Sequence, residues 1–99
     1  TLDQKLVDLS SKSAMVTFSK SNWGNETPYI QSVPVTNLKE TDLCVVGLYY
    51  DPSGLTVDKY SQIQLNGNYI SYFTSKNGQL EATCLSNKPD IDITVQVKW

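Results

Sequence analysis

Apolar and polar residues alternate most regularly toward the end of the chain. From residue 91 to residue 99 every odd-numbered residue is apolar, and every residue between is polar or charged. Residues 80–84 repeat this alternation. Because neighbouring side chains of a strand point to opposite faces, each run predicts a strand with one buried face. The turn through Lys88-Pro89 predicts that the two strands pair as a hairpin.

Four earlier runs also predict strands, at residues 14–18, 29–35, 43–50 and 69–74. Pro34 cannot donate a hydrogen bond, so it predicts an edge or an end for the second of these. The third run is apolar on both faces and therefore predicts a central strand that is covered on both sides. Asn77-Gly78 is typical of tight hairpins and connects the fourth run to residues 80–84.

One internal segment predicts a helix. Apolar residues recur at a spacing of three within residues 56–66, where Thr56 can cap the first turn and Gly67 can end the helix. The loop before the second strand contains Trp23, whose large indole we expect to close one end of the core.

A short leucine seam lies at the start of the chain. It consists of Leu2, Leu6 and Leu9, at the spacings of the a and d positions of a coiled coil. Residues 1–12 therefore predict a helical stub, and a helix this short is marginal in water. Two interpretations stay open: a helix that lies on the domain, or the remnant of a longer oligomeric stalk.

These elements predict a mainly β fold. We expect residues 14–99 to form a small antiparallel β-sandwich with one short helix, preceded by the coiled-coil-like stub of residues 1–12. Ninety-nine residues suffice for one such domain.

Charge and composition narrow the classes of partner. The net charge of −2 gives no electrostatic footprint for nucleic acid or for an anionic membrane. No apolar run approaches the eighteen or so residues of a membrane-spanning helix, so we expect no membrane insertion. Neutral surfaces are the partners that this composition favours.

The sequence predicts neither catalysis nor a metal or cofactor site. The chain contains no histidine, which removes the usual general base, and its two cysteines fit no zinc motif. Cys44 and Cys84 are interpreted as small core residues; a disulfide between them is the alternative, and it requires neighbouring strands. Asp90 and Asp92 are interpreted as the solvated face of the last strand. Three more aspartates, Asp42, Asp51 and Asp58, stand at turns or in a first helical turn, where local structure favours this residue.

Aromatic residues are the most suggestive candidates for binding. Six tyrosines and two tryptophans occur in a chain of this length, and such residues are typical of surfaces that stack on sugars or pack on proteins. The candidate ligand-binding residues are Trp23, Tyr29, Tyr49 and Tyr50.

Several short motifs follow one another in a familiar order. Trp-Gly-Asn at residues 23–25 precedes Pro-Tyr-Ile-Gln-Ser-Val at residues 28–33, and Lys-Pro at residues 88–89 leads into the last strand. Over residues 14–99 the chain resembles a β-rich C-terminal module of structural proteins of tailed bacteriophages of Gram-positive hosts, in tail fibres, baseplate proteins and head fibres. That family has a Trp-Ser/Gly-Gly/Asn loop followed by Pro-Tyr-Thr-Gln-Thr-Val.

Two departures from the family pattern stand out. Cys44 replaces an aliphatic residue, and residues 58–68 lack the acidic and tryptophan signature of the family's helix. The second departure leaves open whether any surface of that helix is shared. The resemblance implies no catalytic residue.

The resemblance and the leucine seam both indicate a virion component. We expect residues 1–12 to continue a homo-oligomeric stalk, a trimer, and residues 14–99 to form its distal knob. Such a knob holds the oligomer together, contacts host cell-surface polysaccharide, or does both. Such a protein is assembled in the bacterial cytoplasm and acts in the extracellular virion. The alternative is a carbohydrate-binding or adhesion module of a secreted bacterial protein, which needs no oligomer.

Overall fold

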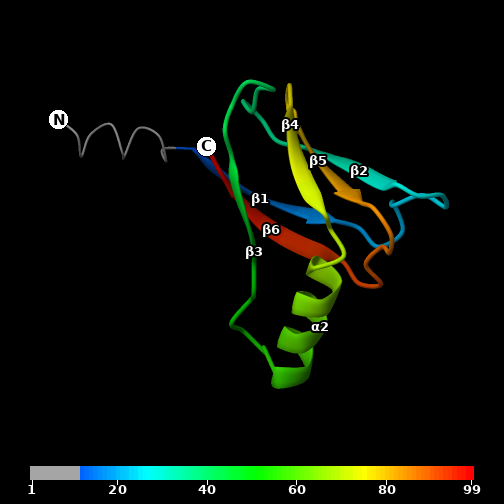
Figure 1. The fold of residues 1–99 in the computed structure, drawn as a ribbon. Coiled ribbons are helices and arrows are strands. Elements are labelled where there is room, and N and C mark those ends of the chain that lie inside the picture. Colours follow the sequence, from blue (N-terminus) through cyan, green and yellow to red (C-terminus); the bar gives the residue numbers. More distant parts are fainter. Residues whose placement is uncertain (1–11) are drawn as a thin grey trace.

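The strands form two three-stranded antiparallel sheets, with one helix at the end of the molecule (Figure 1). This computed structural model describes residues 12–99. Within them the elements are β1 (Ser13–Phe18), β2 (Tyr29–Pro34), β3 (Val45–Leu48), α2 (Val57–Gly67), β4 (Tyr72–Lys76), β5 (Gln79–Cys84) and β6 (Ile93–Lys98). Sheet A has the strand order β1-β6-β3, and sheet B has the order β2-β5-β4. The prediction of a mainly β fold with one short helix is confirmed. The predicted helical stub, with Leu2, Leu6 and Leu9, lies outside the described residues.

The inner faces of the two sheets share one apolar core, as the alternation predicts. The buried apolar residues are Phe18, Trp23, Val35, Leu38, Ile70, Leu80, Ala82, Cys84, Ile93, Val95 and Val97. Phe18 of sheet A stacks on Trp23 with ring centroids 5.8 Å apart and meets Phe73 of sheet B at 5.9 Å. Trp23 is only 1% exposed, so the expectation that it packs into the core is confirmed.

The hairpin predicted between the last two strands is wrong. β5 pairs with β2 and β4, whereas β6 pairs with β1 and β3, so the two strands belong to different sheets. The connection between them includes the buried Pro89 and crosses from one sheet to the other. A segment of this length is not held to the tight two-residue turn that would force pairing. The predicted β4–β5 hairpin through Asn77-Gly78 is present, with Gly78 at φ 74°.

The central position predicted for the third strand is also wrong, because β3 is an edge of sheet A. Val46 and Leu48 face the core, but Leu43 and Val45 are 94% and 72% exposed. The apolar residues of β3 therefore lie on one face that is buried against the core and on one face that is exposed. Pro34 does lie on an edge strand, since β2 borders sheet B.

The helix starts at the predicted cap and ends one residue later than predicted, because Gly67 is the last helical residue and Asn68 is the C-cap. The side chain of Thr56 accepts a hydrogen bond of 3.2 Å from the backbone N–H of Lys59, which caps the first turn. Leu48 packs against Gly67 so closely that a Cβ there would stand 2.7 Å from its methyl groups. The backbone N–H groups of Tyr69 and Ile70 bond to the carbonyls of the last helical turn. These bonds delay β4, which begins later than the alternation predicts.

Candidate functional site

Trp23 and Tyr29, two of the predicted binding residues, have their rings engaged within the fold. Trp23 is buried against Phe18, so it has almost no surface to offer a ligand. Tyr29 is half-buried, and the amine of Lys88 lies 5.1 Å from its ring centroid. The same amine donates a 2.7 Å hydrogen bond to the carbonyl of Gly24. A cation thus lies over one face of the Tyr29 ring.

The two cysteines are free thiols in the structure. Cys44 precedes β3 of sheet A and its Sγ lies 3.1 Å from the hydroxyl of Ser75, whereas Cys84 is buried in β5 of sheet B. The disulfide considered from the sequence requires neighbouring strands, and this condition is not met. Burial raises the pKa of the Cys84 thiol from 9.0 to about 11, which keeps the thiol protonated and unreactive at neutral pH.

Tyr49 and Tyr50 leave β3 toward the helix. The backbone N–H of Tyr49 donates to the carbonyl of Thr94 at 2.9 Å and so extends the ladder between β3 and β6. Tyr50 packs against Tyr60 of α2, with ring centroids 4.9 Å apart. Tyr50 therefore fastens the helix to the sheet, and Tyr49 lines a surface hollow.

Two adjoining hollows lie between α2, the end of β3 and the start of β6. The larger, of about 430 Å³, is lined by Asp58, Lys59, Gln62, Ile63, Ile91 and Asp92. The smaller, of about 240 Å³, is lined by Tyr49, Asp51, Ile63, Asp92 and Thr94. Because Ile63 and Asp92 border both, we treat the two as one site and call it the α2 groove.

Hydrogen bonds from neighbouring elements hold the walls of the α2 groove. Asn66 is 2% exposed; its side-chain carbonyl accepts a 2.7 Å bond from the backbone N–H of Asp90, and its amide donates to the carbonyl of Gln62 at 2.9 Å. The carboxylate of Asp92 accepts a 2.9 Å bond from the backbone N–H of Lys20. Asn66 thus joins the helix to the segment that carries Asp92.

The α2 groove combines an apolar floor with a negatively charged rim. Ile63 and Ile91 are half-buried, and the ring of Tyr49 adds an aromatic wall. Asp51, Asp58 and Asp92 contribute carboxylates, and Lys59 is the one basic residue among the lining residues. Carboxylates accept hydrogen bonds from hydroxyl groups, and an apolar floor suits the C–H face of a sugar ring. No group of three or more metal-ligating side chains occurs among residues 12–99.

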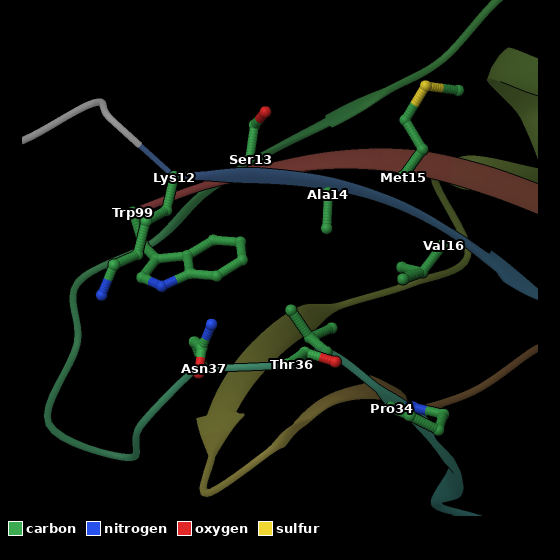
Figure 2. A pocket seen from close by; sticks show the side chains of 10 residues that line it. Lys12, Ser13, Ala14, Met15, Val16, Pro34, Thr36, Asn37 and Trp99 are labelled. Carbon is green, nitrogen blue, oxygen red and sulfur yellow. The ribbon is translucent and has the colours of Figure 1, made fainter.

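A second hollow, of about 460 Å³, lies beside β1 on the far side of sheet A from β3 (Figure 2). Residues 12–16, 34–37 and 99 line it, and we call it the Trp99 hollow. Figure 2 shows the side chains of Ala14, Val16 and Trp99 directed into it, with Met15 directed away. The indole Nε1 of Trp99 is buried without a hydrogen-bond partner, next to the side chain of Asn37.

Sequence reasoning found one wall of the α2 groove and missed the others. Tyr49 was a candidate, whereas Asp51 and Asp92 were assigned to local roles in a turn and on the outer face of the last strand. Asp92 lies just before β6 rather than in it. Three separate segments meet here only through tertiary packing, so spacing along the chain carries no signal for the site.

The comparisons with known proteins assign no family to this chain. No protein-family model matches it, and no curated protein or solved structure matches it at a significant level. Within the described part of the chain, no helix has the length and apolar character needed to cross a membrane.

Proposed function

We propose that this chain is the distal domain of an oligomeric bacteriophage fibre or baseplate protein, and that its α2 groove binds a neutral glycan of the host cell surface. The groove is the observation that carries the binding role, because it is concave, apolar at its floor and bordered by a few polar groups. The carboxylates of the groove repel anionic glycans, and binding of neutral sugars or amino sugars is therefore favoured.

The three motifs that resemble phage structural proteins support the virion role. Residues 88–89 are far in sequence from residues 23–25 and 28–33, yet Lys88 contacts both the carbonyl of Gly24 and the ring of Tyr29. The motifs therefore act together in this fold, where they join two loops to the start of β2. A shared packing requirement of this kind explains why such short motifs would recur together in a family.

The proposed place of action is the virion, outside the cell, after assembly in the bacterial cytoplasm. The free thiols of Cys44 and Cys84 agree with assembly in a reducing compartment. In this proposal residues 1–12 continue a stalk in which Leu2, Leu6 and Leu9 join the copies, most simply as a trimer. No nucleic acid or membrane takes part.

A glycan panel tests the binding role. We expect the chain to bind neutral oligosaccharides and to discriminate against anionic ones at low salt. Tyr49→Ala should weaken binding about fivefold, because loss of one aromatic contact is worth roughly 1 kcal/mol. Tyr72→Ala is the matched control, since Tyr72 is 51% exposed on β4 of sheet B, away from the groove. Equal glycan affinity of the Tyr49→Ala and Tyr72→Ala variants would argue against binding in the α2 groove.

The alternative function is a carbohydrate-binding or adhesion module of a secreted bacterial protein. This module would use the same α2 groove as its binding site, and it needs no oligomer. The solution mass by light scattering separates the two functions. A fibre domain is an oligomer whose mass falls when Leu2, Leu6 and Leu9 are changed to serine, whereas a secreted module is a monomer in both forms.

A further inference from the structure

The Trp99 hollow lies between the edges of the two sheets, apart from the α2 groove. It has a volume of about 460 Å³ and is lined by the start of β1, the end of β2 and the turn that follows β2. β1 is an edge of sheet A and β2 is an edge of sheet B. Ala14 and Val16 point into the hollow, which therefore opens on the core side of β1 (Figure 2). Its volume falls within the range of about 300 to 1,000 Å³ that is typical of small-molecule pockets.

The indole N–H of Trp99 has no acceptor in the described part of the fold. The Nε1 atom is buried, and no acceptor among residues 12–99 lies within hydrogen-bond distance of it. Lys12 and Trp99 exchange backbone hydrogen bonds of 3.3 and 3.1 Å, which fix the backbone of Trp99 at one end of the hollow. A buried N–H without an acceptor costs free energy, and a ligand that supplies an acceptor would remove this cost.

An anchored turn holds Asn37 beside the indole. The backbone N–H of Leu38 donates to the carbonyl of Val35 at 3.2 Å, and Asn37, at the third position of this turn, has φ 71°. Gly78 accepts a 2.9 Å bond from the N–H of Val35 and donates a 2.7 Å bond to the carbonyl of Leu38. Both ends of the turn are therefore fixed to the β4–β5 hairpin. The side chain of Asn37 is exposed, so it is free to turn and admit a ligand to the indole N–H.

Nitrogen atoms of three side chains gather at this end of the hollow. Figure 2 shows the amine of Lys12, the indole nitrogen of Trp99 and the amide of Asn37 at the same end. Lys12 is the one charged residue among the described residues that line the hollow. Ala14 and Val16 add a short apolar wall farther along β1. The hollow thus combines hydrogen-bond donors and a positive charge with a small apolar surface.

We infer that the Trp99 hollow binds a small organic carboxylate. Its carboxylate oxygens accept hydrogen bonds from the indole N–H of Trp99 and the amide of Asn37, near the ammonium group of Lys12. Its short apolar part packs against Ala14 and Val16. A carboxylate suits these donors better than a neutral acceptor does, because charge-assisted hydrogen bonds are stronger than neutral ones. The inference rests neither on glycan binding in the α2 groove nor on the proposed oligomer.

The indole resonances of the ¹⁵N-labelled full-length chain give a direct test. The chain is titrated with butyrate and with benzoate, and its Trp99 resonance is assigned from the peak that Trp99→Phe removes. We expect a saturable downfield shift of the Trp99 Nε1–H with both acids. The Nε1 of Trp23 is also buried without an acceptor among residues 12–99, but Trp23 does not line the hollow, so its resonance is the internal control. Butyramide, the neutral analogue of butyrate, should bind more weakly.

Three variants test the roles of the donors. Trp99→Phe removes the indole N–H and should weaken butyrate binding at least about tenfold, because it removes a hydrogen bond to a charged group. Asn37→Gly removes the amide, and glycine readily adopts the φ of 71° found there, so the turn should be kept. We expect it to weaken binding as well. Lys12→Gln should weaken binding roughly threefold, as expected for an exposed charge. Lys98→Gln is its matched control, because Lys98 is exposed and does not line the hollow.

Several results would overturn the inference. The absence of a saturable shift of the Trp99 resonance with both acids would exclude the site. Equal affinities for butyrate and butyramide would exclude the preference for a carboxylate, and equal losses in Lys12→Gln and Lys98→Gln would show unspecific attraction of anions. If the acids have no effect and Asn37→Gly moves the Trp99 resonance of the free chain, the carbonyl of Asn37 is the acceptor. If Asp8→Asn moves it instead, residues 1–11 supply the acceptor.

Discussion

At the scale of single residues, Asn66 links the helix to the last strand. Its side chain is buried and bonds both to the helical carbonyl of Gln62 and to the backbone N–H of Asp90. This buried amide supplies the connection between β5 and β6 with a hydrogen-bond acceptor for the backbone N–H of Asp90. The same bonds place Asp92 beside Ile63, so Asn66 positions the α2 groove without lining it.

Replacement of Asn66 should therefore affect both stability and the groove. Asn66→Ala removes a buried amide and leaves the N–H of Asp90 without its acceptor in the fold, and we expect it to lower the free energy of unfolding by about 1 to 3 kcal/mol. Asn68→Ala, at an exposed position just after the helix, is the matched control and should cost far less. Urea denaturation measures both, and equal losses would contradict the role assigned to Asn66.

Cys84 gives the fold a dependence on alkaline pH. Its pKa is raised from 9.0 to about 11 by burial, so the folded chain holds the thiol proton more tightly than the unfolded chain does. The stabilisation is complete below pH 9 and is lost as the pH rises from 9 through 11. The full loss is about 2 to 3 kcal/mol for a shift of this size.

The comparison with Cys84→Ala isolates this thiol from the tyrosines and lysines that titrate in the same range. Cys84→Ala is less stable at pH 8 because it leaves a cavity in the core. We expect the difference in unfolding free energy between the two chains to narrow by about 2 kcal/mol between pH 9 and pH 11. A difference that stays constant over this range would show that burial does not raise the pKa.

At the scale of elements, residue patterns within one element predicted its structure correctly more often than they predicted which strands pair. The Thr56 cap, the Asn77-Gly78 hairpin and the buried faces of β5 and β6 follow from residue types at short spacing, and all are confirmed. The partners of β5 and the edge position of β3 depend on which strands meet across the core. The alternation of apolar and polar residues determines which face of a strand is buried. It does not determine which strands lie beside it, so these two predictions were wrong.

The helix cap can be tested directly. Thr56→Ala removes the acceptor for the N–H of Lys59, and we expect a loss of about 1 kcal/mol in stability. Thr56→Ser keeps the hydroxyl and should restore most of it. Because Asp58 and Lys59 of the first turn line the α2 groove, glycan affinity should fall with Thr56→Ala as well. Equal stability of all three chains would show that the cap contributes nothing.

At the scale of the whole molecule, the two ends of sheet A carry different surfaces. Tyr49, Thr94 and the helix form the α2 groove at one end, while Val45, Met15 and the start of β1 lie toward the other. A domain joined to its neighbours at the β1 end would keep the groove free at the opposite end. This separation matches the proposed fibre, in which the stalk and the ligand lie on opposite sides of the knob.

The groove itself was beyond the reach of sequence patterns. Tyr49 was recognisable as an aromatic residue of a strand end, but Asp51 and Asp92 each have a sufficient local reason for their positions. Trp23 and Tyr29 had the chemistry of binding residues, and the fold uses them for packing. Residue type alone does not separate an aromatic ring that binds from one that packs, because burial decides between them.

The central claim is that the α2 groove binds a neutral glycan, and amide chemical-shift mapping tests it most directly. A ¹⁵N-labelled chain is titrated with the best neutral oligosaccharide from the panel. The account predicts saturable shifts at Tyr49, Ile63, Asp92 and Thr94, with none at Ser32 on the far sheet. Shifts centred on Tyr29 or on the Trp99 hollow, or no saturable shift with any neutral glycan, would contradict it.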